Sequence, residues 1–280
     1  MPDPAVSVVV PTRNRAEYLR VTLASLAAQA PGVPHETIVV DDGSTDATAD
    51  VAVRGGALYL RHERSLGPNA ARNTGIEAAR GSLIAFVDDD VRMPRHWVGA
   101  LAAGAVRHKW AEAFGGPIRA SLEGPAPRTC GRESPPITTL DLGERDRETD
   151  FVWSANMAAR RGAFERVGRF DADVPIYGDE EEWLMRLHAA GGRVAYVAAA
   201  GLEHRRAGAD ARLRALAHAE YRRGRAARAN DRRKRTEPAL PRELRDLAGA
   251  SWHTLRRGCP RGLTMCAHST GRLVEALRPR

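Results

Sequence analysis

Short apolar runs alternate with helix-patterned segments from residue 6 to residue 107, and this alternation constrains the fold more than any other feature. The runs are rich in β-branched residues and are followed by turn-forming residues, as buried strands are. They span residues 6–10, 37–40, 57–60 and 83–87. The expected helices between them span residues 15–30, 44–53, 68–80 and 94–107. Strands that alternate with helices predict an α/β fold with a mostly parallel sheet covered on both faces.

The pattern changes after Gly115. Residues 115–143 are rich in Gly and Pro with little periodicity, which predicts a long loop. We expect a strand over 151–159, a helix over 179–190 and a strand over 193–197. Beyond residue 209 the pattern is helical only, over about 209–229, 240–257 and 262–277. The sequence therefore predicts an α/β domain over 1–205 and a helical C-terminal region over 206–280.

Charge is distributed unevenly along the chain, whose net charge is +8. The segment from Arg205 to Arg280 holds 20 Lys and Arg against 7 Asp and Glu, whereas acids exceed bases before it. A basic tail on an acidic body predicts anionic partners. We expect peripheral association with an anionic membrane and no specific nucleic acid. The alternative is that a GC-rich genome has enriched Arg and Ala throughout.

The three cysteines, Cys130, Cys259 and Cys266, form no Cys-x-x-Cys pair. Neither a zinc knuckle nor a disulfide framework is therefore indicated, and a reducing cytosol fits best. No apolar run approaches the ~18 residues typical of a membrane span. The N-terminus has no basic start and too short an apolar stretch for a signal peptide. We expect a cytoplasmic protein, at most peripheral on the inner face of the membrane.

Acidic clusters follow two of the expected strands. Asp41 and Asp42 follow the second strand, and Asp88-Asp89-Asp90 follow the fourth. Ligands of open α/β sheets bind beyond the carboxyl ends of strands, so parallel neighbours would bring both clusters to one edge. Asp-Gly-Ser after a strand is also ordinary turn chemistry. Three adjacent carboxylates, however, repel one another unless a cation lies among them, and oxygen ligands suit Mn²⁺ or Mg²⁺.

A third acidic cluster, Asp179 to Glu182, opens an expected helix. Acidic residues are favoured in a first helical turn by the helix dipole, and Glu182 and Arg186 have the i,i+4 spacing of a surface ion pair. Four consecutive acids nevertheless exceed what a helix start requires. One of them is a candidate general base.

Five segments together resemble the ordered motifs of the family 2 inverting glycosyltransferases, which adopt the GT-A fold. These segments are Val6 to Arg13, Asp41 to Ser44, Gly67 to Gly75, Asp88 to Asp90 and Gly178 to Arg186. Each motif alone is weak, but five in this order and spacing are specific, and the resemblance covers roughly residues 5–205. It implies transfer of a sugar from a nucleoside diphosphate donor to an acceptor that the sequence does not identify.

The resemblance implies a nucleotide site at the first two strand ends. Pro11, Thr12 and Arg13 would lie at the base and ribose. Asp42, or its neighbour Asp41, would accept a hydrogen bond from the base. The imide N–H of uracil is a suitable donor, so we expect a UDP-sugar.

The resemblance also implies a metal and diphosphate site. Asp88 would hold the ribose or a metal-bound water, and Asp90 would bind the metal. The run departs from the commoner Asp-x-Asp-Asp form, so Asp89 could be the ligand instead. Arg72 and Asn73 would line the donor site near the diphosphate, the alternative being an exposed polar helix face.

Further roles follow from the last motif and from what comes after it. Glu180 matches the position of the catalytic base, with Asp179 as the alternative because the two acids are exchanged in type. His204 would complete the metal site, unless it is a surface residue of a basic stretch. The segment from Phe151 resembles the family's acceptor side, where Trp153 and Asn156 are the candidates.

Two other functions remain open at this level. Nucleotidyl transfer to a sugar phosphate uses the same fold, but its Gly-rich first turn is absent after Val10. A non-catalytic module that binds an anionic ligand or nucleic acid would depend on the Arg-rich tail.

Overall fold

A computed structural model describes the chain except at residues 1–3, 125–126, 129, 132–135, 175–178 and 279–280. The chain divides into two compact units, each described here by itself. The described parts of Met1–Arg119, Thr139–Val174 and Asp179–His204 form the first, and those of Ala120–Thr138 and Arg205–Arg280 belong to the second. The described part of the segment 120–138 thus groups with the C-terminal helices.

The first unit is built on an eight-stranded sheet with the order β3-β2-β1-β4-β9-β6-β10-β8. Its strands are β1 (Val6–Thr12), β2 (His35–Asp41), β3 (Leu58–Arg61), β4 (Leu83–Val87), β6 (Ala113–Gly115), β8 (Arg147–Thr149), β9 (Asn156–Arg160) and β10 (Val194–Tyr196). β1 is parallel to β2 and β4, and β2 to β3, whereas β9 is antiparallel to both β4 and β6. The mostly parallel α/β fold is therefore confirmed.

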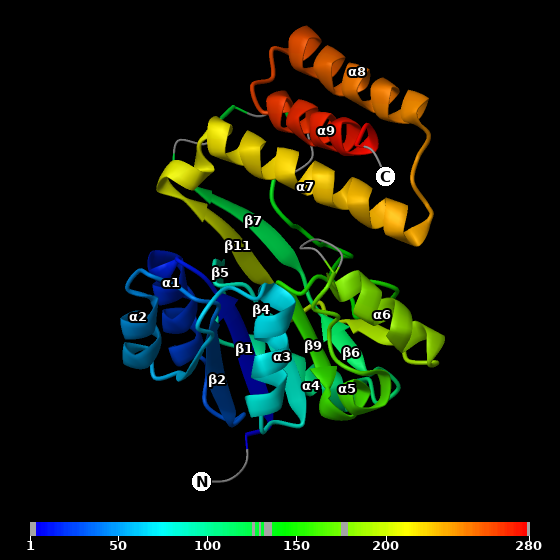
Figure 1. The fold of residues 1–280 in the computed structure, drawn as a ribbon. Coiled ribbons are helices and arrows are strands. Elements are labelled where there is room, and N and C mark those ends of the chain that lie inside the picture. The colour runs from blue at the N-terminus through cyan, green and yellow to red at the C-terminus, as the bar shows by residue number, and fades with distance from the viewer. Residues whose placement is uncertain (1–3, 125–126, 129, 132–135, 175–178, 279–280) are drawn as a thin grey trace. The chain divides into compact units, whose positions relative to one another are not determined.

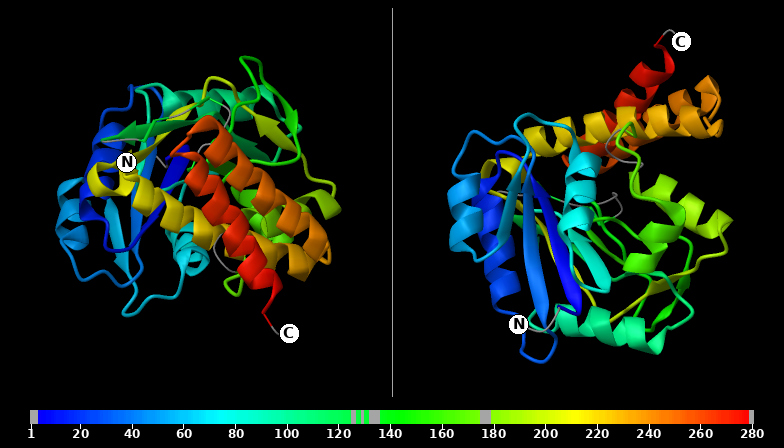
Figure 2. Two further views of the ribbon diagram at one scale, coloured as in Figure 1. Left: turned by 90° about the horizontal axis from the view of Figure 1, so that it is seen from above. Right: turned by 60° about the horizontal axis from the view of Figure 1, so that its bottom comes forward.

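Helices cover both faces of this sheet (Figures 1 and 2). They are α1 (Ala16–Ala27), α2 (Thr48–Arg54), α3 (Pro68–Ala78), α4 (Trp97–Arg107), α5 (Arg161–Val167) and α6 (Asp179–Ala189). Alternate residues of β1 enter different cores, because successive side chains of a strand point to opposite faces. Val8 packs with residues of α1, α2 and α4, and Val9 with residues of α3, α5 and α6.

A second sheet has three strands in the order β5-β11-β7. These are β5 (Val91–Arg92), β7 (Ile118–Glu123) and β11 (Leu202–Ala207). β7 corrects the prediction of a long loop over 115–143, since it lies inside that span. The strand predicted over 151–159 begins only at Asn156, because the preceding residues form a turn.

The second unit contains a 3₁₀ turn, Gly208–Ala211, and three helices, α7 (Leu213–Lys234), α8 (Leu240–Arg257) and α9 (Gly262–Ala276). α7 and α9 approach closely at Gly224, where an added Cβ would lie 2.0 Å from a backbone oxygen of α9. The carboxylate of the buried Glu243 lies between two arginines, 3.2 Å from Arg228 and 2.8 Å from the partly buried Arg272. In the described part of the chain, no helix is long and apolar enough to cross a membrane.

Candidate active site

The Asp88-Asp89-Asp90 run lies at the carboxyl end of β4, a central strand whose five residues are all buried. Asp88, Asp90 and His204 each offer one ligand atom, and these atoms lie within 4.8 Å of one another. Ligands of an octahedral ion at about 2.1 Å stand about 3 Å apart when adjacent and about 4 Å apart when opposite. Two carboxylates and an imidazole at this spacing fit a divalent cation.

Strand pairing explains the position of His204. β11 runs antiparallel to β5, and the register places His204 opposite Val91, the residue that follows Asp90. The His204 Nε2 consequently lies 3.1 Å from Asp90 Oδ1, and both side chains are almost completely buried. His204 is therefore a buried neighbour of the acidic run rather than a surface residue.

Asp89 faces a different set of groups. Thr12 Oγ1 donates to Asp89 Oδ2 at 2.7 Å, and Arg15 Nε lies 3.3 Å from Asp89 Oδ1. Among the described residues, the group of candidate ligands contains Asp88 and Asp90 but not Asp89. As metal ligands, the geometry thus favours Asp88 and Asp90 over Asp89.

Arg15 belongs to the site and was not predicted. Its Nη2 lies 2.6 Å from Asp90 Oδ2, and its guanidinium lies 4.4 Å from the centre of the Tyr18 ring. Burial acts to lower the pKa of Arg15, but Asp89 and Asp90 raise it overall above its usual range. The sequence feature that could have indicated Arg15 is its position in Arg13-Asn14-Arg15, directly after the first strand.

The carboxylates of the run are electrostatically crowded. Burial raises the pKa of Asp88, and the neighbouring Asp90 carboxylate raises it further. Burial also raises the pKa of Asp89 to about 7, although Arg15 acts in the opposite direction. Burial and mutual repulsion thus oppose ionisation of these carboxyl groups, and a bound cation would favour it.

Helix α3 places Arg72 at the acidic run. The side chain is 5% exposed, donates to Ser154 Oγ at 3.0 Å and lies 3.8 Å from Asp88 Oδ1. Arg72 is therefore not part of an exposed helix face. Asn73 instead exchanges two hydrogen bonds with the backbone of Phe170, at 2.8 and 3.1 Å, so its amide ties α3 to the segment after α5.

The two acids at the carboxyl end of β2 differ in the number of hydrogen bonds that they accept. Asp41 accepts the Ser44 amide at 2.8 Å and the Tyr59 hydroxyl at 2.7 Å. Asp42 accepts from four groups of one loop, namely His62, Ser65, Leu66 and Gly67. Burial acts to raise the pKa of Asp42, yet these hydrogen bonds hold it below its usual range. Because a carboxylate has about four acceptor positions, Asp42 is saturated and Asp41 is not.

The three residues predicted at the nucleotide lie at this same sheet edge. Pro11 is half-buried, Thr12 is buried and Arg13 is exposed. The next residue, Asn14, has a positive φ of 53°, and its side-chain oxygen accepts the Thr45 amide at 2.7 Å. This bond holds the turn after β1 to the turn after β2.

The structure describes only part of the acidic segment that begins α6. Gly178 lies outside the described residues, and Asp179 is described only as the first residue of α6. Glu180 is 4% exposed. Glu182 forms the expected ion pair with Arg186, at 2.7 Å, so it belongs to the framework of α6.

The two acceptor candidates differ in accessibility. Trp153 is half-buried and packs edge-to-face on Phe151, with ring centres 4.6 Å apart. Asn156 is 0% exposed: it accepts from Trp97 Nε1 at 3.0 Å and donates to the carbonyls of Pro117 and Ala200. Its amide thus joins β9 to neighbouring segments and presents no atom to solvent.

At the carboxyl end of β4, the mostly parallel sheet thus carries two carboxylates, and β11 adds the imidazole of His204. The profile of the family described as Glycosyl transferase family 2 matches residues 7–168, which is more than half of the chain. The chain belongs to this family.

Curated relatives are also glycosyltransferases. Glycosyltransferase AglE of Haloferax volcanii is 28% identical over 194 residues, 67% of this chain and 62% of its own length. Pre-mycofactocin glycosyltransferase of Mycobacterium tuberculosis is 33% identical over 208 residues, 71% of this chain and 42% of its own length. The chain thus spans only about two fifths to three fifths of these relatives.

Solved structures support the fold. The mannosyltransferase PcManGT from Pyrobaculum calidifontis, in complex with GDP-Man and Mn²⁺, matches with a TM-score of 0.65 at 17% identity over 97% of this chain and 87% of its own. S. aureus TarS 1–349 in complex with UDP-GlcNAc matches with a TM-score of 0.56 at 16% identity over 95% and 90%. At these identities the likeness establishes the GT-A fold alone.

Proposed function

We propose that the chain is a metal-dependent, inverting glycosyltransferase that moves a sugar from a UDP-sugar to an acceptor. The observation that carries the proposal is the convergence of Asp88, Asp90 and His204 at the end of β4 in a family 2 domain. The acceptor is not identified by this site.

Mn²⁺ or Mg²⁺ would be held by Asp88, Asp90 and His204, whose oxygen and nitrogen donors suit these ions. When bound, the ion would neutralise charge that grows on the diphosphate leaving group. Arg72 would add a positive charge on the same side, since its guanidinium already lies 3.8 Å from Asp88. Arg15 would orient Asp90 through their 2.6 Å contact.

Binding of the nucleotide would use the ends of β1 and β2. Asp41 accepts two hydrogen bonds and can accept more, whereas Asp42 already accepts four. In this proposal Asp41 accepts the imide N–H of uracil, and Asp42 holds the loop 62–67 in place. Pro11, Thr12 and Arg13 would face the base and ribose.

Glu180 would act as the general base, and Asp179 is the alternative. A base removes the proton of the acceptor group while that group attacks the anomeric carbon. Attack from the face opposite the diphosphate inverts the configuration, and it requires the acceptor to be held in line. Trp153 remains the better acceptor contact, because Asn156 is enclosed.

The proposal is tested by a donor screen with Mn²⁺ present, in which release of nucleoside diphosphate is measured. Turnover of UDP-sugars above all other donors is the expected result. Preference for a GDP-sugar would contradict the choice of nucleotide and leave the class of reaction intact. Pyrophosphate released from a nucleoside triphosphate and a sugar phosphate would instead indicate nucleotidyl transfer.

Binding of UDP is expected to depend on a divalent ion, because Asp88 and Asp90 repel a diphosphate when no cation lies between them. Calorimetry of UDP with Mn²⁺ should show tight binding, and with EDTA the affinity should fall by at least about tenfold, or ~1.4 kcal/mol. Equal affinity under both conditions would remove the metal from the proposal.

We also propose that the enzyme works in the cytoplasm, peripheral to an anionic membrane, through helix α8. Its exposed side chains include Leu244, Trp252 and Leu255, which are 50, 64 and 79% exposed and share one side of the helix. Arg245 and Arg256 lie along one edge of this apolar side, and the Arg256 guanidinium lies 5.7 Å from the centre of the Trp252 ring. Apolar residues with flanking Arg suit the headgroup region of an anionic bilayer.

Cosedimentation of the full chain with phosphatidylserine-containing vesicles is expected, and replacement of Trp252 and Leu255 by Glu should abolish it. Each basic residue near an anionic surface contributes ~1 kcal/mol, so high salt should also release the protein. The matched control is Val106→Glu, at a side chain of α4 that is 71% exposed. If the unaltered chain does not cosediment, the basic tail reflects composition, and if the Glu variant of α8 still cosediments, α8 is not the membrane contact.

A further inference from the structure

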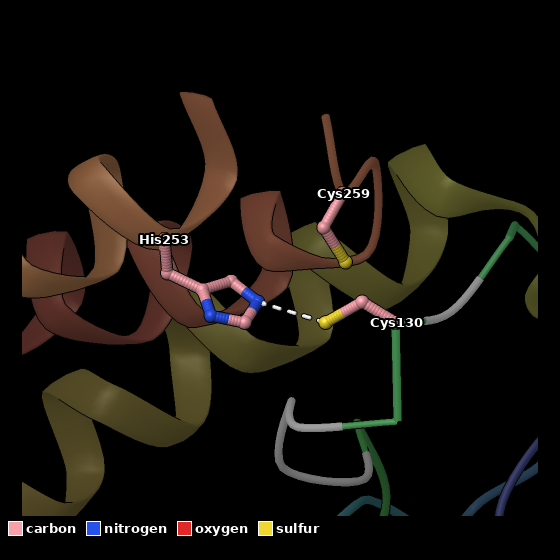
Figure 3. A group of neighbouring side chains, drawn as sticks. All are labelled: Cys130, His253 and Cys259. Atoms are coloured by element: carbon pink, nitrogen blue, oxygen red, sulfur yellow. Dashed lines mark hydrogen bonds between the residues drawn. The ribbon is translucent and has the colours of Figure 1, made fainter. Parts of the chain in front are cut away.

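Three metal-binding side chains converge in the second unit (Figure 3), and none of them belongs to a motif of the family. Cys130 lies in the segment after β7, His253 lies in α8, and Cys259 follows the end of α8. The Cys130 Sγ lies 3.4 Å from the His253 Nε2, and the three ligand atoms all lie within 4.8 Å of one another. Residues far apart in the sequence thus form one compact donor set.

The turn that ends α8 holds two of these donors together. Gly258 adopts the left-handed conformation, with φ 52° and ψ 37°. The amides of Gly258 and Cys259 then donate back to the carbonyls of Leu255 and Thr254, the pattern of a Schellman motif. This reversal returns Cys259 toward the turn that carries His253, and it buries Cys259 to 2% exposure.

The helix that follows supports the same arrangement. α9 begins at Gly262, where an added Cβ would lie 3.0 Å from His253 Cδ2 and 2.5 Å from Thr254 Oγ1. Such close approach restricts the ring of His253. Its position is therefore set by helix packing, as is that of Cys259, and only Cys130 comes from a distant segment.

The spacing fits a tetrahedral zinc ion. Zn–S bonds of about 2.3 Å and Zn–N bonds of about 2.0 Å place a sulfur and a nitrogen about 3.5 Å apart, and two sulfurs about 3.8 Å apart. The observed 3.4 Å between Cys130 and His253 matches the first value. Thiolate ligands also select zinc over Mn²⁺ or Mg²⁺, which prefer oxygen.

We propose that Cys130, His253 and Cys259 form a zinc site, with water as the fourth ligand. Binding of Zn²⁺ would release the protons of the two thiols and leave neutral imidazole and two thiolates on the metal. The site would join the segment that holds Cys130 to the end of α8. It is independent of the proposed sugar transfer.

Cys266 is a matched control within the same unit. Its Sγ lies 3.4 Å from Thr254 Oγ1 and 3.9 Å from Ser251 Oγ. It is not a member of the donor set described here. A thiol is therefore available whose loss should not affect zinc.

The test uses the full chain, stripped with a chelator and reloaded with Zn²⁺ or Co²⁺ alone. We expect one tightly bound zinc and, with Co²⁺, a near-ultraviolet sulfur-to-metal band. Cys130→Ser should lower the band to half or less, because Cys259 is then the one thiolate of the site, and should weaken zinc binding at least about 100-fold, since loss of even an outer-shell partner costs ~10–100-fold. Cys266→Ser and Asp90→Asn should both retain the band, which separates this site from the one at β4.

Two results would overturn the proposal. One is the absence of a sulfur-to-cobalt band in the unaltered protein, and the other is a band of undiminished intensity in Cys130→Ser. Thiol counting under non-reducing conditions adds an independent readout. Three reactive thiols without metal and one with zinc are expected, whereas a Cys130–Cys259 disulfide in the purified protein would contradict a metal role.

Discussion

Replacement of Asp90 by Asn is expected to abolish sugar transfer and the effect of Mn²⁺ on UDP binding. Asp90 is 1% exposed and lies between Arg15 and His204, at 2.6 and 3.1 Å. The amide keeps the shape of the carboxylate but not its charge. A metal contributes several kcal/mol to the stabilisation of transition-state charge, so turnover should fall on the order of 10³-fold. Nucleoside diphosphate release and calorimetry with and without Mn²⁺ measure both effects.

Asp89→Asn is the matched control for this prediction. It makes the same substitution one residue away, at a side chain that accepts from Thr12 at 2.7 Å and lies outside the donor group. UDP binding by Asp89→Asn should still respond to Mn²⁺. If Asp89→Asn loses the response and Asp90→Asn keeps it, the metal ligand is Asp89 and the assignment of Asp90 is wrong.

Local sequence patterns predicted most of the long strands and helices, because each of these elements has its own periodicity of apolar residues. The apolar run Leu83–Val87 is β4 without any change in its bounds, and the helical segments of the tail match α7, α8 and α9 to within a few residues. Short elements gave no such signal. β5 has two residues, and β11 reads Leu-Glu-His-Arg-Arg-Ala, which has little apolar character.

The missed elements matter for the site. His204 was a candidate only through resemblance, and the pairing of β11 with β5 is what brings it to Asp90. Arg15 was missed because a basic residue after a strand is common and carries no periodic signal. The carboxyl end of β4, in contrast, was predictable, since parallel strands bring their acidic ends to one edge.

The cysteines show the same limit of prediction from local sequence patterns. Spacing along the chain indicated no metal site, because sequence rules for zinc depend on ligands that lie close together. Cys259 and His253 are neighbours across a helix end, but Cys130 reaches them only through the tertiary structure. No local pattern contains that contact.

Replacement of Glu180 by Gln is expected to lower turnover by about 10²–10⁴-fold, the usual contribution of a general base. Gln keeps size and polarity but cannot take up the proton of the acceptor. Binding of UDP should stay within a few-fold, since the donor would be held by Asp90 and the strand ends. Initial rates and UDP calorimetry on the same preparation separate the two effects.

Two variants of the same helix decide what a loss of turnover means. Glu182→Gln breaks the 2.7 Å ion pair with Arg186, so it reports the effect of loosening α6 and should leave most turnover intact. Asp179→Asn tests the neighbouring acid. If Asp179→Asn alone stops transfer while Glu180→Gln stays active, the base is displaced by one residue from the expected position. If neither variant slows transfer, the acidic run serves only to start α6, and the proton must be taken by a group outside this helix.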